Sequence, residues 1–596
     1  MLTIKSERTV FLEKAYKEKW GKAPDNTYAA LQHKAALEQF AGLPKWEKIA
    51  RSSYAAMVEQ DIYIEEYDRI IGRVFWCTHK PVEQMDPELD FMEKPAREVE
   101  KQYPLYDEMW ENQFFSRYAG RGHITWRWDW ILKYGVSGLR NRYRELLAQA
   151  ADDKAREFYQ GVLILLDSIT DWNRKHVDVL KEKNMMEMAA ICERVPEYPA
   201  RTFHEAVQAF YMQYLAVMSE NPYGGNGPGR LDYYLWPYLK TDLENGTCTL
   251  QEARELVDEL FLRFDESVHI HDGWGTTLSI GGTGADGKSS VTALSYIMTE
   301  SFMGLNVTHP YYYLRVPADA EPAFLELCAE YLKHGHNRAQ ILNDEPIMRA
   351  MINSGVSPED AIDYCCGGCM EISPHGRNSD FLYQGWHNMP KFVELAITGG
   401  KCLKTGKQLL STRFIGLEAH TDFEDFYQEL EREISYFIGV FFHTQDIFSQ
   451  EAAESRPAYL ISSMIQDCAE KGRNMHDGGA RYHYYATSPL AMANAADALF
   501  AVKKAVFEEK ICTAAELIRA LEADFEGYEA LRLKLQKIPK YGQQNPEADA
   551  FAARFMNSVC DAYAAVKVRC GGVAMPMVLT FLFAPLSAEI LGATSD

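Results

Sequence analysis

The sequence predicts an α/β protein whose first part, residues 1–220, is mainly helical. Near the end of that part, FHEAVQAFYMQYLAVM at 203–218 repeats apolar residues at the three-and-four spacing of a helix. Short β-rich runs then begin, with TLSIGG from 277, YYYLRV from 311 and AQILND from 339. Helical patterns such as AFLELCAEYLKHG from 323 lie between them. Strands that alternate with helices favour a parallel sheet or barrel in residues 221–596.

Turn and capping signals mark the boundaries of these elements. Residues 221–230, NPYGGNGPGR, contain too much glycine and proline for a helix or strand, so they are predicted to be loop. A looser helix start is expected at Ser357, where Pro358 would take the first helical position. Three further starts fit the capping box, in which a threonine is followed three residues later by a glutamate: Thr249 with Glu252, Thr421 with Glu424, and Thr513 with Glu516.

Length and composition limit the class of protein. A chain of 596 residues predicts two or more domains by default, although one large α/β barrel also fits. Hydrophobic residues make up 47% and charged residues 25%, which is ordinary for a globular protein. The net charge of −23 argues against nucleic acid or an anionic membrane as a partner, because neither is attracted to an acidic surface.

The sequence also predicts a cytoplasmic protein. The N-terminal segment MLTIKSERTVFLEKAYKEKW has no apolar core of signal-peptide length, and no run is long enough to span a bilayer. Twelve cysteines over this length are too sparse for a disulfide framework, which favours a reducing compartment.

The stretch CCGGCMEIS at 365–373 contains the residues most suited to chemistry. It follows the helix expected from Ser357 and precedes the loop-like PHGRNSDFLYQGWHN. Gly367 and Gly368 permit a tight backbone, so Cys369 is predicted at or near the tip of a turn.

Four interpretations of this stretch are open. The cysteines could be small apolar fillers of a buried turn. Cys366 and Cys369 have the C-x-x-C spacing of a zinc half-site, for which His269 and His271 in VHIHDG would be distant complements. The same pair could be a redox site, although it follows a helix instead of opening one. Finally, one cysteine could react while Glu371 moves a proton.

The surroundings favour the catalytic interpretation through a family resemblance. GGCMEI, followed by GWHN and then FVELAITGGKC, resembles the cysteine loop of the glycyl radical enzymes, where a GCVEP-like loop precedes GWHD. Further stretches resemble family motifs in the same order along nearly the whole chain: CERVPEYPARTF from 192, GPGRLDYYLWPYL from 227, LNDEP from 342, GGARYHY from 478, ADALFAVKKAVFEEK from 496, PKYGQQNPEAD from 539, RCGGVAMPMVLT from 569 and the final GATSD.

The resemblance implies a fold and a mechanism. The family fold is a ten-stranded α/β barrel of two five-stranded half-sheets surrounded by helices. Residues 1–596 would then form one barrel domain with a helical part, 1–220, and a barrel part, 221–596. In the family a stored glycyl radical takes hydrogen from the loop cysteine, and the resulting thiyl takes hydrogen from the substrate. By position, Cys369 would be the thiyl and Glu371 the base.

The resemblance also implies partners. The radical glycine of the family lies in a motif like RVSGY, which this sequence does not contain, so the glycine-radical domain is predicted to be absent from this chain and supplied in cis or in trans. The chain itself is expected to bind no cofactor and no metal. Its radical would be installed by a radical S-adenosylmethionine activase, its substrate would be a small molecule, and the protein would form a homodimer.

Glu371 points to one branch of the family. A glutamate at this position resembles the dehydratases, the C–N and C–S lyases and the arylacetate decarboxylases, so the predicted reaction is C–O, C–N, C–S or C–C cleavage. Pyruvate formate-lyase uses two adjacent cysteines instead. Cys365 and Cys366 are adjacent but upstream of the turn, so an acyltransferase stays an alternative, as does a non-catalytic barrel paralogue.

The residues around the substrate depart from the polyol dehydratase pattern. Asn388 stands in place of the aspartate of GWHD, and together with His387 it is the predicted substrate-binding pair, with plain packing in a loop as the alternative. Gly224 and Gly225 stand near the family's histidine and serine. Fewer charged substrate contacts would remain, so a polyol such as glycerol is not the expected substrate.

Overall fold

The computed structural model describes residues 5–19, 27–74, 82–116, 121–222, 225–267, 276–334, 339–368, 371–382 and 385–578. The protein is mixed α/β and mostly helical. It consists of two compact units, each built from several chain segments. The first comprises Met1–Phe91, Arg121–Asp380 and Ala452–Tyr482, and the second comprises Met92–Gly120, Phe381–Glu451 and His483–Asp596.

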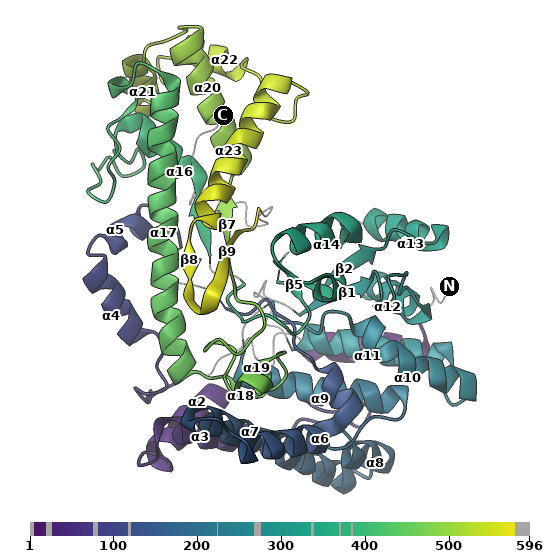
Figure 1. Cartoon of the computed structure of the whole chain (residues 1–596). Coiled ribbons are helices and arrows are strands. Elements are labelled where there is room, and N and C mark those ends of the chain that lie inside the picture. The colour runs from purple at the N-terminus through teal and green to yellow at the C-terminus, as the bar shows by residue number, and fades with distance from the viewer. Residues whose placement is uncertain are drawn as a thin grey trace. The chain divides into compact units, whose positions relative to one another are not determined.

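Helices dominate the first unit (Figure 1). They are α1 (Glu7–Lys19), α2 (Tyr28–Glu38), α3 (Lys45–Glu59), α6 (Asp129–Ala148), α7 (Asp153–Glu182), α8 (Met186–Arg194), α9 (Phe203–Glu220), α10 (Leu231–Asn245), α11 (Leu250–Glu266), α12 (Ala293–Gly304), α13 (Pro322–Lys333), α14 (Asp344–Asn353), α15 (Pro358–Ile362), α18 (Tyr459–Ser462) and α19 (Cys468–Lys471). Helix α9 is buried on nearly every side, which explains why its sequence is apolar beyond a single face.

Two sheets position the site in the first unit. Strands β1 (Thr277–Gly281), β2 (Tyr311–Val316) and β3 (Ala339–Asn343) form a parallel sheet in that order. Helix α12 connects β1 to β2 and α13 connects β2 to β3, as parallel strands require. Strands β4 (Tyr364–Gly367) and β5 (Glu371–Pro374) form an antiparallel hairpin.

The second unit packs helices around a four-stranded sheet of order β6-β7-β9-β8. Its strands are β6 (Trp386–Asn388), β7 (Tyr484–Leu490), β8 (Lys567–Val568) and β9 (Gly572–Pro576). Its helices are α4 (Glu93–Gln102), α5 (Tyr106–Glu111), α16 (Met389–Thr398), α17 (Phe423–Ser455, whose last residues belong to the first unit), α20 (Met492–Val502), α21 (Ala514–Glu522), α22 (Glu529–Gln536) and α23 (Pro546–Ala564), with a π-helical turn at Lys503–Glu508 and 3₁₀ turns at Leu417–Ala419 and Arg569–Gly571. Its large core is rich in phenylalanine, much of it from α17.

Most of the predicted element starts are confirmed. The three β-rich runs form β1, β2 and β3, and the capping box of Thr249 is complete, with bonds in both directions. Ser357 caps α15 and Thr513 caps α21. The prediction for Thr421 is wrong by one residue, because the carboxylate of Asp422 accepts the hydrogen bond from the Glu424 N–H at 2.8 Å.

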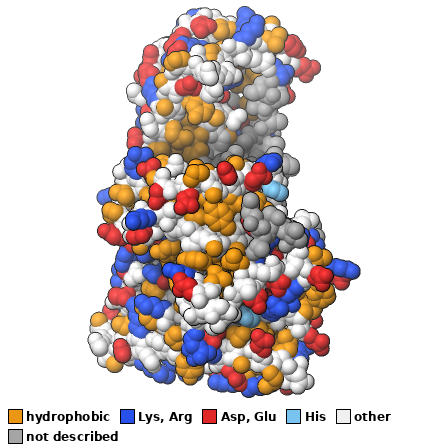
Figure 2. All heavy atoms as spheres, turned by 90° about the vertical axis from the view of Figure 1, so that its right-hand side faces the viewer, with side chains coloured by type: hydrophobic (Ala, Val, Ile, Leu, Met, Phe, Trp, Pro, Cys, Tyr) orange, Lys and Arg blue, Asp and Glu red, His pale blue; other side chains and the backbone are white. Residues whose placement is uncertain are grey.

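The barrel is not seen as a closed ring of strands. Within the described ranges the strands form separate sheets of three, two and four strands. None of the helices in these ranges is both long and apolar enough to cross a membrane. The ten cysteines they contain form no disulfide. On the face shown in Figure 2, acidic and basic side chains are intermixed.

Candidate active site

The hairpin β4–β5 carries the candidate catalytic sequence. Gly367 pairs with Glu371 at the end next to the connection, and the register continues to Tyr364 opposite Pro374 at the open end. Of the three residues between Gly367 and Glu371, Gly368 is described and lies in a turn. Cys369, the predicted thiyl residue, lies outside the described residues, as do His269 and His271 of the metal interpretation.

Glu371 forms a buried ion pair with a histidine that sequence reasoning missed. Both side chains are fully buried, and His123 Nδ1 lies 3.0 Å from Glu371 Oε2. A carboxylate in a protein interior is strongly destabilised unless it has such a partner. The pair therefore keeps an ionisable carboxyl inside the first unit, two residues after Cys369 in the sequence.

The loop that presents His123 has an unusual backbone. The φ angle of His123 is 60°, in the left-handed region that few residues other than glycine adopt. The peptides on both sides of Ile124 are held, because its N–H donates to Asn226 Oδ1 at 3.2 Å and its carbonyl accepts from the Gly227 N–H at 3.2 Å. No spacing rule connects position 123 to position 371, so local sequence patterns did not single out this histidine.

Two glycines allow the His123 ring to approach the hairpin closely. A Cβ atom on Gly368 (φ +49°) would lie 1.9 Å from His123 Nδ1, and one on Gly225 (φ +76°) would lie 2.3 Å from His123 Cδ2. Gly225 stands near the position where the resemblance gives the family a serine. Because Gly225 has no side chain, the His123 imidazole can occupy the space beside it.

Gly225→Ala is expected to lower the free energy of unfolding by about 2–4 kcal/mol, because it adds both backbone strain and a clash with His123. Gly246 is the matched control, since it has a similar φ of +68° and no atom within 4 Å of an added Cβ. Gly246→Ala should lower it by about 1 kcal/mol. Denaturant unfolding followed by tryptophan fluorescence measures both. Equal losses in the two variants would contradict the close packing on His123.

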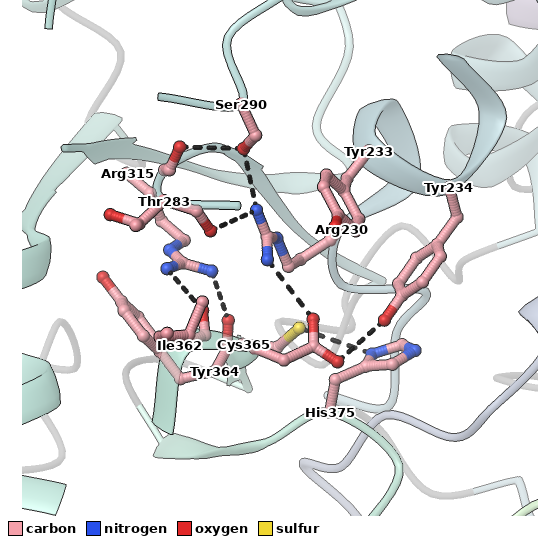
Figure 3. Close-up of polar contacts among 12 residues, drawn as sticks. Arg230, Tyr233, Tyr234, Thr283, Ser290, Arg315, Ile362, Tyr364, Cys365 and His375 are labelled. Atoms are coloured by element: carbon pink, nitrogen blue, oxygen red, sulfur yellow. Dashed lines mark hydrogen bonds and ion pairs between the residues drawn. The ribbon is translucent and has the colours of Figure 1, made fainter. Parts of the chain in front are cut away.

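The base of the hairpin is held by a buried polar network (Figure 3). Asp363 accepts hydrogen bonds from Tyr234 at 2.7 Å, from Arg377 at 3.0 Å and from Arg230 at 3.3 Å. Arg315 donates to the carbonyls of Ile362 and Tyr364 at 3.0 and 2.8 Å. These bonds tie the first strand of the hairpin to α10 and to β2.

Cys365 is packed inside this network. Its Sγ lies 3.4 Å from His375 Nδ1, and the two side chains face each other in Figure 3. Burial raises the pKa of the Cys365 thiol to about 12 and lowers the pKa of His375, so both groups are neutral near pH 7. These surroundings are those of a small filler residue, and they disfavour Cys365 as a nucleophile.

Cys365 should therefore resist alkylation in the folded chain. With a thiol pKa of about 12, only about one molecule in 10⁴ carries the thiolate at pH 8. Iodoacetamide should label the exposed Cys570 at least about 100-fold faster. Mass spectrometry of quenched digests gives both rates, and unfolding in urea should remove the difference. Equal labelling before unfolding would show that the buried arrangement is wrong.

The predicted substrate-binding pair lies in the second unit. His387 Nδ1 and Thr487 Oγ1 both contact the hydroxyl of Tyr563, at 2.7 and 2.5 Å, and burial lowers the pKa of His387 to about 3. The ring of Phe441 packs edge-on against the imidazole. Asn388 caps α16, with its side chain accepting from Lys391 N–H at 3.2 Å. Their contact with a substrate stays a prediction.

Comparison with known proteins identifies the family. The sequence model described as "Pyruvate formate lyase-like" matches residues 97–584. The chain belongs to the pyruvate formate lyase-like family. The match includes the hairpin, the His123 loop and β6, so the predicted and the newly found site residues all lie inside the family region.

Curated relatives of this pyruvate formate lyase-like chain include dehydratases and lyases. It is 27% identical over 440 residues to trans-4-hydroxy-L-proline dehydratase of Clostridioides difficile, covering 71% of this chain and 55% of the relative. It is 29% identical over 465 residues to isethionate sulfite-lyase of Desulfovibrio desulfuricans, covering 72% and 56%. The chain thus spans little more than half the length of these curated relatives.

Solved structures support the fold of the pyruvate formate lyase-like chain. A structure described under 1,2-propanediol dehydration in Roseburia inulinivorans matches with a TM-score of 0.89 at 22% identity, covering 100% of this chain and 83% of that one. The B12-independent glycerol dehydratase from Clostridium butyricum, in its glycerol-bound form, matches with a TM-score of 0.87 at 23% identity, covering 96% and 80%. At these identities the likeness concerns the fold.

Proposed function

We propose that this chain is the catalytic core of a glycyl-radical-type lyase or dehydratase. Its substrate is a small molecule with a hydroxyl on the carbon next to the bond that breaks, which is a C–O, C–N, C–S or C–C bond. The observation that carries the proposal is the buried Glu371 at the start of β5, two residues after Cys369 in the sequence. Its carboxylate contacts His123, which comes from a different loop. The dehydratases and lyases among the relatives support the same branch.

The proposed architecture is the ten-stranded barrel, with residues 1–220 as its mainly helical part and 221–596 as its barrel part. Its support is the high structural similarity to the two dehydratase-related structures. The proposed partners are the glycine-radical domain, in cis or in trans, the activase and a second copy of this chain. The glycyl radical, when present, supplies the unpaired electron that makes Cys369 a thiyl.

The thiyl of Cys369 breaks a C–H bond at the hydroxyl-bearing carbon, leaving a thiol and a substrate radical. The Glu371 carboxylate takes the hydroxyl proton, which makes the carbon electron-rich and expels the leaving group from its neighbour with the bonding electron pair. The resulting radical next to a carbonyl takes hydrogen back from the Cys369 thiol. The proton on Glu371 then goes to the leaving group, so atoms and electrons balance.

His123 keeps Glu371 ready for this step. A buried carboxyl without a partner would take up a proton and lose its function as a base. His123 Nδ1 lies 3.0 Å from Glu371 Oε2, so the other carboxylate oxygen, Oε1, is the one assigned to the substrate hydroxyl. His387 and Asn388 are further proposed substrate contacts.

The acyltransferase alternative has less support. Cys365 and Cys366 are both fully buried strand residues, and the pKa of the Cys365 thiol is raised. Neither property suits a pair of cysteines that passes an acyl group between them.

The test is a cleavage assay in the assembled enzyme, with activase and glycine-radical domain, under strictly anaerobic conditions. The substrates are small compounds with a hydroxyl beside a carbon that bears a hydroxyl, amino or sulfonate group. A carbonyl product and the released group are expected whenever the glycyl radical is detected by electron paramagnetic resonance. A full radical signal without cleavage of any of these compounds would argue for the non-catalytic paralogue.

A further inference from the structure

Gly368, the last described residue before Cys369, is held through both of its backbone polar groups. Its N–H donates to the Gly225 carbonyl at 2.8 Å, and its carbonyl accepts from the Tyr313 hydroxyl at 2.9 Å. That carbonyl belongs to the peptide bond that joins Gly368 to Cys369. A peptide plane held on one side by its carbonyl cannot rotate without breaking this hydrogen bond.

The Tyr313 hydroxyl is itself in a fixed place. Tyr313 lies in the middle of β2, between β1 and β3, and its side chain is only 1% exposed. A tyrosine has two side-chain torsions, and packing on a three-stranded sheet fixes both. Its hydroxyl is therefore a stable donor for the hairpin.

The β1–β2–β3 sheet forms a second hydrogen bond with the β4–β5 hairpin, next to the one from Tyr313. Ser279 on β1 is the register partner of Tyr313, and its Oγ accepts from the Cys366 N–H at 2.9 Å. The Cys366 N–H and the Gly368 carbonyl, two residues apart, therefore both bond to side chains of this sheet. Two neighbouring side chains of the sheet thus hold this stretch of backbone.

We propose that Tyr313 is a positioning residue for the reaction, which holds the Gly368 carbonyl and with it the backbone between Gly367 and the reacting Cys369. This inference rests on the proposed function. Tyr313 does not exchange a proton or a hydrogen atom in it. Its effect comes from geometry, because a displacement of about 1 Å between reacting groups can lower a rate about 100-fold.

The test compares Tyr313→Phe with Tyr312→Phe. Both variants remove one hydroxyl from a buried tyrosine of β2, but the Tyr312 hydroxyl shares a hydrogen bond with Thr299 on α12 at 2.9 Å. In the chain alone, hydrogen–deuterium exchange is followed in the peptide that spans 364–372. We expect the Gly368 N–H to exchange about fivefold faster in Tyr313→Phe, and unchanged in Tyr312→Phe.

In the assembled enzyme the same two variants are compared kinetically. Tyr313→Phe should lower kcat about 10- to 100-fold with KM changed less than about twofold, and a deuterated substrate should show a larger isotope effect on kcat. Tyr312→Phe should keep wild-type kcat. Ser279→Ala, which removes the neighbouring anchor, should act in the same direction as Tyr313→Phe.

The outcomes separate this inference from the proposed function. If Tyr313→Phe and Tyr312→Phe have equal kcat and equal exchange in 364–372 while Cys369→Ala is inactive, the positioning role is wrong and the proposed function stands. If KM rises with kcat unchanged, Tyr313 binds substrate and the positioning role is also wrong. If Cys369→Ala turns over normally, the proposed function fails first.

Discussion

Cys369→Ala is expected to abolish turnover while the glycyl radical signal stays at full intensity. The cysteine acts after the radical has been stored, so its loss cannot prevent storage, but no other group would then take hydrogen from the substrate. Activity is measured as carbonyl product in the assembled, anaerobic enzyme, and the radical by electron paramagnetic resonance. Loss of both signals together would show that the variant is misassembled, not that Cys369 reacts.

Cys366→Ala is the matched control, because it removes a thiol from the same short stretch. Cys366 is fully buried on β4 and contacts the sheet through its backbone N–H, which alanine keeps. Substantial activity should therefore remain. An inactive Cys366→Ala beside an active Cys369→Ala would reverse the assignment and favour the pyruvate formate-lyase-like alternative with its adjacent cysteines.

Local sequence signals were sufficient for most elements near the site. The runs from 277, 311 and 339 became β1, β2 and β3 because period and β-branched or aromatic content agree there. Ser357 with Pro358 gave the start of α15. Near Thr421 the same reasoning failed, because Thr421 and Asp422 are both good capping residues and only the entry angle of the chain decides between them.

The partners of the site residues could not be predicted in this way. His123 meets Glu371 only because the loop at 121–125 and the loop at 225–229 lie against the hairpin. Such a contact depends on the path of the chain over hundreds of residues, which no spacing rule encodes. The sequence contains Gly225 and Gly368, but only the structure shows that they leave room for the His123 imidazole.

The glycines next to Glu371 leave it as the side chain proposed to contact the substrate hydroxyl. Gly225 and Gly368 have no side chains, and the Gly368 N–H already donates to the Gly225 carbonyl at 2.8 Å. In the function proposed above, the Glu371 carboxylate both recognises the substrate hydroxyl and removes its proton. Because Glu371 is proposed both to bind the substrate hydroxyl and to remove its proton, replacing it should lower kcat strongly.

Glu371→Gln should accordingly lower kcat about 10²–10⁴-fold, the usual contribution of a positioned base, and leave the glycyl radical signal unchanged. Glutamine keeps the size of the side chain and can still contact His123 Nδ1, so the hairpin should persist and thermal unfolding should change little. Glu359→Gln, an exposed neighbour in the first turn of α15, is the matched control and should have wild-type kcat. Turnover by Glu371→Gln at the wild-type rate would remove Glu371 as the base, while hydrogen abstraction by Cys369 would still be open to its own test.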